Sequence, residues 1–139
     1  MKNSNLRFTN IVTSFIKSNG KILILKRSDK VKSMKCLWAG ISGIIENGET
    51  PLTRAKIEIF EEAGIHGVQI ELLKAIQQIK ILSPQYKNHE WNIFPFLFKA
   101  KNPEIKLNWE NSEFRWIEPT EIKNYETVPE LEKILFSLL

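Results

Sequence analysis

The sequence is poor in cysteine and histidine. Among 139 residues there are one Cys and two His. A single thiol excludes an intramolecular disulfide and fits a reducing compartment. We expect Cys36 to act as a small, buried or half-buried apolar side chain. His89 has no second His or Cys at a zinc-ligand spacing, so a structural role is expected for it.

Long apolar runs and dense basic runs are also missing. No run approaches the ~20 residues of a membrane span. The first ten residues, MKNSNLRFTN, are polar, so no signal peptide is expected. The net charge is +4, but the lysines are spread along the chain. DNA is therefore not an expected partner, whereas an anionic small molecule suits the charge. These features predict a soluble cytoplasmic protein.

The apolar pattern predicts one α/β domain over residues 1–139, with a mixed β-sheet between helical layers. Asn19-Gly20 predicts a tight hairpin between two strands. Pro95 predicts a bulge or an edge position for its strand. The segment 68–82 is expected to form one or two strands, with a bend near Lys74-Ala75. The other expected elements are strands at 6–18, 21–26, 37–45, 89–100 and 113–117, a helical turn at 120–124 and a closing helix at 128–139.

The stretch 43–65 carries the clearest local signals. It reads GIIENGETPLTRAKIEIFEEAGI. Thr50 is a good N-cap, and Pro51 suits the first helical position, where no N–H is needed. Gly64 can adopt the left-handed conformation that ends a helix. The sequence therefore predicts a helix over residues 51–63, with Ile65 packing back on its last turn.

This helix has an apolar face and an acidic face. Leu52, Ala55, Ile59 and Ala63 share the apolar face, with Phe60 at its edge. Three carboxylates lie three or four residues apart on the other face, where they repel one another. They are Glu58, Glu61 and Glu62. A Glu-rich face is ordinarily just solvated, but a divalent cation such as Mg²⁺ would also relieve the repulsion.

The spacing of these residues resembles the signature of the Nudix hydrolase family (MutT-like). That signature is Gly, five residues, Glu, seven residues, then Arg-Glu-apolar-x-Glu-Glu-x-Gly-apolar. Eight of its nine fixed positions are matched within 23 residues. The exception is the arginine position, which holds Ile57. The matching residues are Gly43, Glu49, Glu58, Ile59, Glu61, Glu62, Gly64 and Ile65.

The resemblance implies a Nudix-like α/β/α sandwich and hydrolysis of a nucleoside diphosphate linked to another moiety. It also implies Mg²⁺ or Mn²⁺, held by the three glutamates and by the backbone carbonyl of Ser42. Either Glu61 or Glu58 is expected to be the general base, unless a loop glutamate such as Glu110 or Glu113 serves instead. Arg27 is a candidate for binding substrate phosphate. Gly43, Glu49 and Gly64 are expected to support the site.

Ile57 cannot supply the guanidinium that the family uses to hold its glutamates. Arg54 lies four residues before Glu58 and seven before Glu61, so it projects between them on a helix. We therefore hypothesise that Arg54 partly replaces the missing arginine. The alternative is that Arg54 is a solvated surface residue.

Other functions stay open at this level. The loss of the signature arginine is compatible with a weak or inactive Nudix-like module that binds a nucleotide. Isopentenyl-diphosphate isomerase shares the fold, but its cysteine motif has no match around Cys36. RNA decapping would call for a basic patch or an extra domain. A homodimer is possible. Four aromatic residues could stack on a base, although a core role is expected for each: Trp38, Tyr86, Phe94 and Trp109.

Overall fold

The computed structural model describes residues 7–82 and 87–139. Strands β1 to β4 are Arg7–Ser18, Lys21–Arg27, Trp38–Ala39 and Ile41–Ile44; helix α1 is Pro51–Ala63, and the 3₁₀ turn η1 is Gly67–Gln69. Strands β5 to β8 are Ile70–Ala75, Ile79–Leu82, His89–Ala100 and Asn111–Ile117; the 3₁₀ turn η2 is Pro119–Asn124, and helix α2 is Leu131–Leu138. Within the described residues, no helix is long and apolar enough to cross a membrane.

The strands form one mixed sheet with the main order β3-β2-β1-β7-β5. Strands β1 and β7 run parallel, and the other pairs are antiparallel. Strand β4 pairs with β1, β6 pairs with β7, and β8 pairs with β2. The predicted mixed sheet is therefore confirmed.

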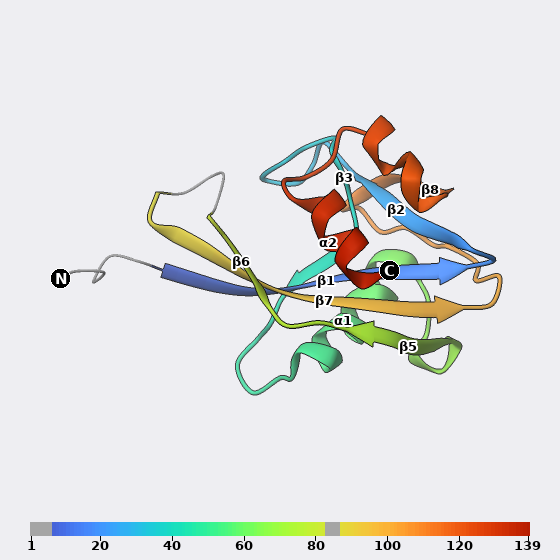
Figure 1. The fold of residues 1–139 in the computed structure, drawn as a ribbon, viewed down its shortest axis with the longest axis horizontal. Coiled ribbons are helices and arrows are strands. Elements are labelled where there is room, and N and C mark those ends of the chain that lie inside the picture. The colour runs from blue at the N-terminus through green and yellow to red at the C-terminus, as the bar shows by residue number, and fades with distance from the viewer. Residues whose placement is uncertain (1–6, 83–86) are drawn as a thin grey trace.

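Helices cover both faces of the sheet. In β1, Val12 and Ile16 pack in a core that contains residues of α1, whereas Phe15 packs in a second core that contains residues of α2. This alternation follows from the two-residue period of a strand. Figure 1 shows α2 in front of β1 and β7, with α1 behind them. The expected α/β/α sandwich is thus observed.

The local signals placed the hairpin and α1 correctly. Asn19 and Gly20 have φ values of 53° and 79°, as the tight turn between β1 and β2 requires. The Thr50 side chain accepts a hydrogen bond from the Thr53 N–H at 3.1 Å, and Gly64 ends α1 with φ 73°. Ile65 is fully buried, consistent with the expected packing after the cap.

The largest differences from the predicted element boundaries lie around β3, β8 and α2. The segment 37–45 is two strands, β3 and β4, which pair with β2 and β1 respectively and are separated at Gly40. Strand β8 begins at Asn111, two residues earlier than expected. Helix α2 begins at Leu131 and not at Val128, because Glu130 has φ 68° and interrupts any earlier helical turn.

The prediction for Pro95 was wrong. Strand β7 lies inside the sheet, between β1 on one side and β5 and β6 on the other. Pairing to β5 ends at Phe96 and pairing to β6 begins at Ile93, so Pro95 faces the interval between these two strands. A residue without an N–H is tolerated there because, although Thr13 of β1 pairs with Pro95 on one side, no residue of β5 or β6 pairs with it on the other. The segment 68–82 contains two strands, and the break after Ala75 lies where the bend was predicted.

Cys36 also departs from its prediction. The side chain is exposed, and its backbone has a φ of 64°. It lies in the loop between β2 and β3, so it does not fill a core position.

Candidate active site

Three carboxylates meet beside helix α1. Oxygen atoms of Glu58, Glu62 and Glu110 all lie within 4.8 Å of one another. Glu58 and Glu62 are on α1, one turn apart, and are only 8% and 4% exposed. Glu110 is half-buried and comes from the residue before β8. Buried acids at this spacing repel one another unless a proton or a cation intervenes.

Glu58 is held by a charged partner. Arg54 Nη1 donates to Glu58 Oε2 at 3.0 Å. The Nε and Nη2 atoms of the same guanidinium donate to the two oxygens of Glu49, at 2.9 and 2.6 Å. Glu49 also accepts from the backbone N–H of Glu46 at 2.7 Å. Arg54 therefore links Glu49, in the loop before α1, to Glu58 on the helix.

Gly43 makes room for the same carboxylate. A Cβ atom on Gly43 would overlap the carboxyl group of Glu58. Residue 43 lies in β4, which pairs with β1 at Val12. The absence of a side chain at this position thus lets β4 and α1 approach closely enough to bury Glu58.

Glu62 is held differently. Asn111 Nδ2 donates to Glu62 Oε1 at 3.1 Å, and both side chains are buried. Glu62 Oε2 is also buried and has no hydrogen-bond partner among the described residues. Burial raises the pKa of Glu62 well above its ordinary value, the Asn111 hydrogen bond opposes the rise, and the charge of Glu110 adds to it. Burial likewise raises the pKa of Glu58, and the neighbouring Glu62 carboxyl and the bond from Arg54 oppose that rise.

The donor set suits a hard divalent cation. It contains carboxylate oxygens only, as Mg²⁺ and Mn²⁺ prefer. The buried, unpartnered Oε2 of Glu62 is an atom that a bound cation would satisfy. These residues therefore fit a metal ion, and they include two of the three glutamates that the sequence indicated.

The third glutamate of the predicted face lies near this trio without belonging to it. Glu61 is exposed and lines the same cavity as Glu58 and Glu110. Of the two loop candidates, only Glu110 reaches the site. Glu113 is on the surface, where it pairs with Lys26 at 3.5 Å and with Arg115 at 3.7 Å.

A cavity of about 520 Å³ opens beside the carboxylates. Arg27 lines it, as the sequence suggested for a phosphate ligand, and its Nε and Nη2 donate to the Ser33 carbonyl at 3.3 and 3.1 Å. Ser42 also lines the cavity, and its Oγ is 3.1 Å from Thr13 Oγ1. Apolar and aromatic side chains contribute much of the remaining wall: Ile11, Met34, Ile44, Trp91, Ile93, Val128, Leu131 and Ile134.

The four aromatic residues considered for base stacking lie in different environments. Trp38 is buried and meets Tyr125 edge to face, and Phe94 packs against the core, as expected. Trp109 is 61% exposed, so the core role expected for it was wrong. Tyr86 lies outside the described residues. Sequence reasoning missed Trp91, which lines the cavity; its alternation with Ile93 on one strand could have suggested it.

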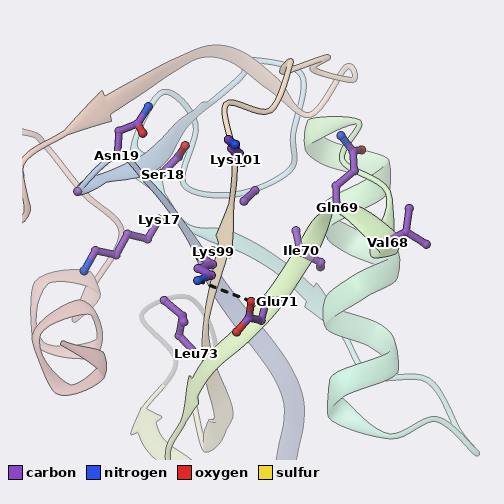
Figure 2. Close-up of a pocket in the computed structure, with 12 residues that line it drawn as sticks. Lys17, Ser18, Asn19, Val68, Gln69, Ile70, Glu71, Leu73, Lys99 and Lys101 are labelled. Carbon is purple, nitrogen blue, oxygen red and sulfur yellow. Dashed lines mark ion pairs between the residues drawn. The ribbon is translucent and has the colours of Figure 1, made fainter.

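A second hollow, of about 730 Å³, lies at the other end of the sheet (Figure 2). It is lined by the last residues of β1 and β7, whereas the first cavity is lined by earlier residues of both strands. Lysine side chains surround it, and Lys99 Nζ is 3.7 Å from Glu71 Oε1. The larger hollow therefore contains none of the three clustered glutamates.

The sequence profile of the NUDIX domain matches residues 7–138. The chain belongs to the Nudix hydrolase family. The prediction of a pyrophosphohydrolase is confirmed at that level. In this Nudix chain the signature arginine is replaced by a half-buried isoleucine, Ile57, while Arg54 provides the guanidinium that contacts Glu58.

Several known proteins are similar to this Nudix chain. A nucleoside triphosphatase, NudI of Escherichia coli, is 25% identical over 126 residues, which cover 87% of this chain and 89% of that protein. An RNA pyrophosphohydrolase of Bartonella bacilliformis is 30% identical over 113 residues, covering 68% and 62%.

Solved structures share the fold. The MutT protein of Methanosarcina mazei has a TM-score of 0.75 with 19% identity, covering 95% of this chain and 93% of that one. An Ap4A hydrolase of C. elegans has a TM-score of 0.72 with 20% identity, covering 95% and 96%.

Proposed function

We propose that the chain is a metal-dependent pyrophosphohydrolase. It cleaves a phosphoanhydride bond in a nucleoside diphosphate linked to another moiety, as in a nucleoside triphosphate or a nucleotide sugar. The observation that carries the proposal is the trio of Glu58, Glu62 and Glu110, which includes a buried oxygen without a protein partner and opens on a cavity that Arg27 lines.

Glu58, Glu62 and Glu110 would hold Mg²⁺ or Mn²⁺, with Glu61 and the Ser42 carbonyl as further oxygen ligands on the same cavity. When bound, such a cation neutralises phosphate charge and activates water. Binding the cation adds little free-energy cost to the folded chain, because the cation relieves the repulsion among the buried carboxylates.

The side chains divide the remaining work. Arg27 binds a phosphate of the substrate, since a guanidinium can donate two parallel hydrogen bonds to it. Glu61 accepts the proton of the attacking water, whose oxygen forms a bond to phosphorus as the anhydride P–O bond breaks. We assign this role to Glu61 over Glu58 because Glu58 Oε2 is already committed to Arg54.

The apolar wall of the cavity suits the nucleoside part. Trp91 offers a planar surface; Ile93 lies two residues further along β7, and Ile11 of β1 pairs with Ile93. The names of the similar proteins point the same way, because a nucleoside triphosphatase, an RNA pyrophosphohydrolase and an Ap4A hydrolase all act on nucleotide compounds. Nucleoside triphosphates are therefore the first substrates to test, with 5′-triphosphorylated RNA as the larger alternative.

The test is product release from a substrate panel, with Mg²⁺ and with Mn²⁺. The panel holds nucleoside triphosphates, nucleotide sugars, ADP-ribose, NADH, dinucleoside polyphosphates and 5′-triphosphorylated RNA. We expect metal-dependent release of phosphate, pyrophosphate or nucleoside monophosphate, which Glu58→Gln should abolish. Glu61→Gln should lower kcat more strongly than it weakens Mn²⁺ binding, because Glu61 is the proposed base and only one of several oxygen ligands. Tight nucleotide binding without turnover on any substrate would instead support a binding module.

A further inference from the structure

Asn111 lies outside α1 and donates a hydrogen bond to Glu62, the most deeply buried carboxylate of the site. Its side chain is 7% exposed, and its Nδ2 donates to Glu62 Oε1 at 3.1 Å. The bond joins the first residue of β8 to the last turn of α1, 49 positions apart in the sequence. Nothing in the signature pattern includes this residue.

An irregularity in β8 lets Asn111 reach the site. Lys26 pairs with Glu113, but Arg27 pairs with Asn111, so Ser112 is an extra residue opposite β2. In a regular strand, successive side chains point to opposite faces. Glu110 lies in the turn before β8, where this alternation does not apply, so Glu110 and Asn111 can both reach Glu62.

The segment before β8 is also fixed. The Asn108 side chain accepts from the Glu110 N–H at 3.0 Å and donates to Glu110 Oε1 at 3.1 Å. The Ser28 N–H donates to the Glu110 carbonyl at 2.8 Å. Asn111 therefore projects from a firmly held backbone, so its amide can define the orientation of Glu62 and not merely follow it.

The chemistry of the contact explains why an amide stands there. An amide N–H₂ donates to a carboxylate without neutralising it, whereas a lysine or arginine would add a positive charge beside the cation. Glu58 already has such a charged partner, Arg54. The hydrogen bond occupies Oε1 of Glu62 and leaves Oε2 without a partner among the described residues.

We infer that Asn111 is a positioning residue, which orients Glu62 so that Oε2 is presented to the divalent cation. The inference rests on the proposed function, because it assumes that the three glutamates bind a metal ion. Asn111 itself contacts neither the cation nor the substrate in this scheme. Its effect on catalysis passes through Glu62 alone.

The test is Mn²⁺ binding to the free protein, measured without nucleotide, for wild type, Asn111→Leu and Asn111→Ser. Leucine matches asparagine in size but has no donor, and serine covers the case in which leucine disturbs folding. We expect the Kd for Mn²⁺ to rise about tenfold in both variants, as for other residues that orient metal ligands. Activity should recover at saturating Mn²⁺, with KM for the nucleotide unchanged. Asn124→Leu is the matched control, because Asn124 is exposed at the end of η2.

A double-mutant cycle with Glu62→Gln completes the test. If Asn111 acts through Glu62, Asn111→Leu should cause no additional loss of Mn²⁺ affinity in the Glu62→Gln background. If the wild type binds Mn²⁺ and hydrolyses nucleotides but the Asn111 variants have the same Kd for Mn²⁺, this inference is wrong and the proposed function stands. A wild type that binds no divalent cation would overturn both.

Discussion

Glu58 occupies the space that a Cβ atom on Gly43 would need. The relationship joins strand β4 to helix α1 and places a carboxylate in a buried position at the edge of the cavity. Glycine is required here for close approach and not for an unusual backbone angle, since Gly43 is not among the residues with positive φ.

Gly43→Ala should therefore damage the site more than the fold. The three atoms nearest to such a Cβ are Cγ, Cδ and Oε2 of Glu58, so a side chain and not the backbone must move. We expect kcat/KM to fall roughly a hundredfold, because a displacement of about 1 Å at a catalytic group can cost that much. Thermal melting should remain close to that of wild type. Gly67→Ala is the matched control, since a Cβ there meets nothing within 4 Å; equal effects of the two changes would contradict the prediction.

Arg54→Ala should weaken both the fold and the site. The change removes the guanidinium that pairs with Glu49 and Glu58, whose side chains are 19% and 11% exposed respectively. We expect a loss of about 1.5–3 kcal/mol in the free energy of unfolding, as for hydrogen bonds to charged groups. Mn²⁺ affinity and kcat should fall as Glu58 loses its fixed orientation. Lys56→Ala, an exposed change on the same helix, should do neither.

Arg54→Ala/Ile57→Arg is the sharper experiment on this point. The second change restores the signature arginine at its usual place. We expect it to recover most of the lost turnover if a guanidinium beside Glu58 is what matters. Ile57→Arg alone measures any damage to packing. Unchanged turnover and metal affinity in Arg54→Ala would show that Arg54 does not support the site.

Glu110 and Glu113 form a natural pair for comparison. Glu110→Gln should raise the Kd for Mn²⁺ about tenfold and lower kcat/KM by two or more orders of magnitude, because it removes one oxygen ligand from the trio. Glu113→Gln breaks only surface ion pairs, which contribute about 0–1 kcal/mol. Calorimetric metal titration and steady-state kinetics on both variants would check this. A larger effect from Glu113→Gln would refute the assignment.

Glu62→Gln should give a pH-dependent gain in stability when metal is absent. The pKa of Glu62 is raised by burial, so the folded chain binds more protons than the unfolded chain once pH exceeds the ordinary glutamate pKa of about 4.3. Stability from this group is then lost as pH rises through the folded pKa. The Tm advantage of Glu62→Gln over wild type should therefore grow as pH rises above the ordinary glutamate pKa.

Divalent metal should reverse that advantage, because the cation stabilises the ionised carboxylate. Melting curves in chelator and in Mn²⁺ would measure both effects. The exposed change Glu104→Gln is the control and should show no such trend. An advantage that is constant with pH would mean that Glu62 does not titrate in this range.

The sequence by itself determined the features that depend on neighbours along the chain. Thr50, Pro51 and Gly64 set the limits of α1 through local hydrogen bonds and backbone preferences, and the structure reproduces those limits. The spacing of Glu58 and Glu62 placed them one turn apart for the same reason. Arg54 was within reach of Glu58 by helical geometry alone, and their ion pair is observed.

Only the tertiary structure decided which distant residues join them. Glu110 and Glu113 are equally acidic in sequence, but Glu110, in the turn before the irregular pairing of β8 with β2, lies beside Glu58 and Glu62, whereas Glu113, after it, does not. The same irregularity brings Asn111 to Glu62, and no local sequence pattern predicts this contact. Pro95 lies inside the sheet because β5 and β6 leave a gap opposite it. Strand pairing joins residues far apart in the chain, so its register is a property of the assembled sheet and not of any one segment.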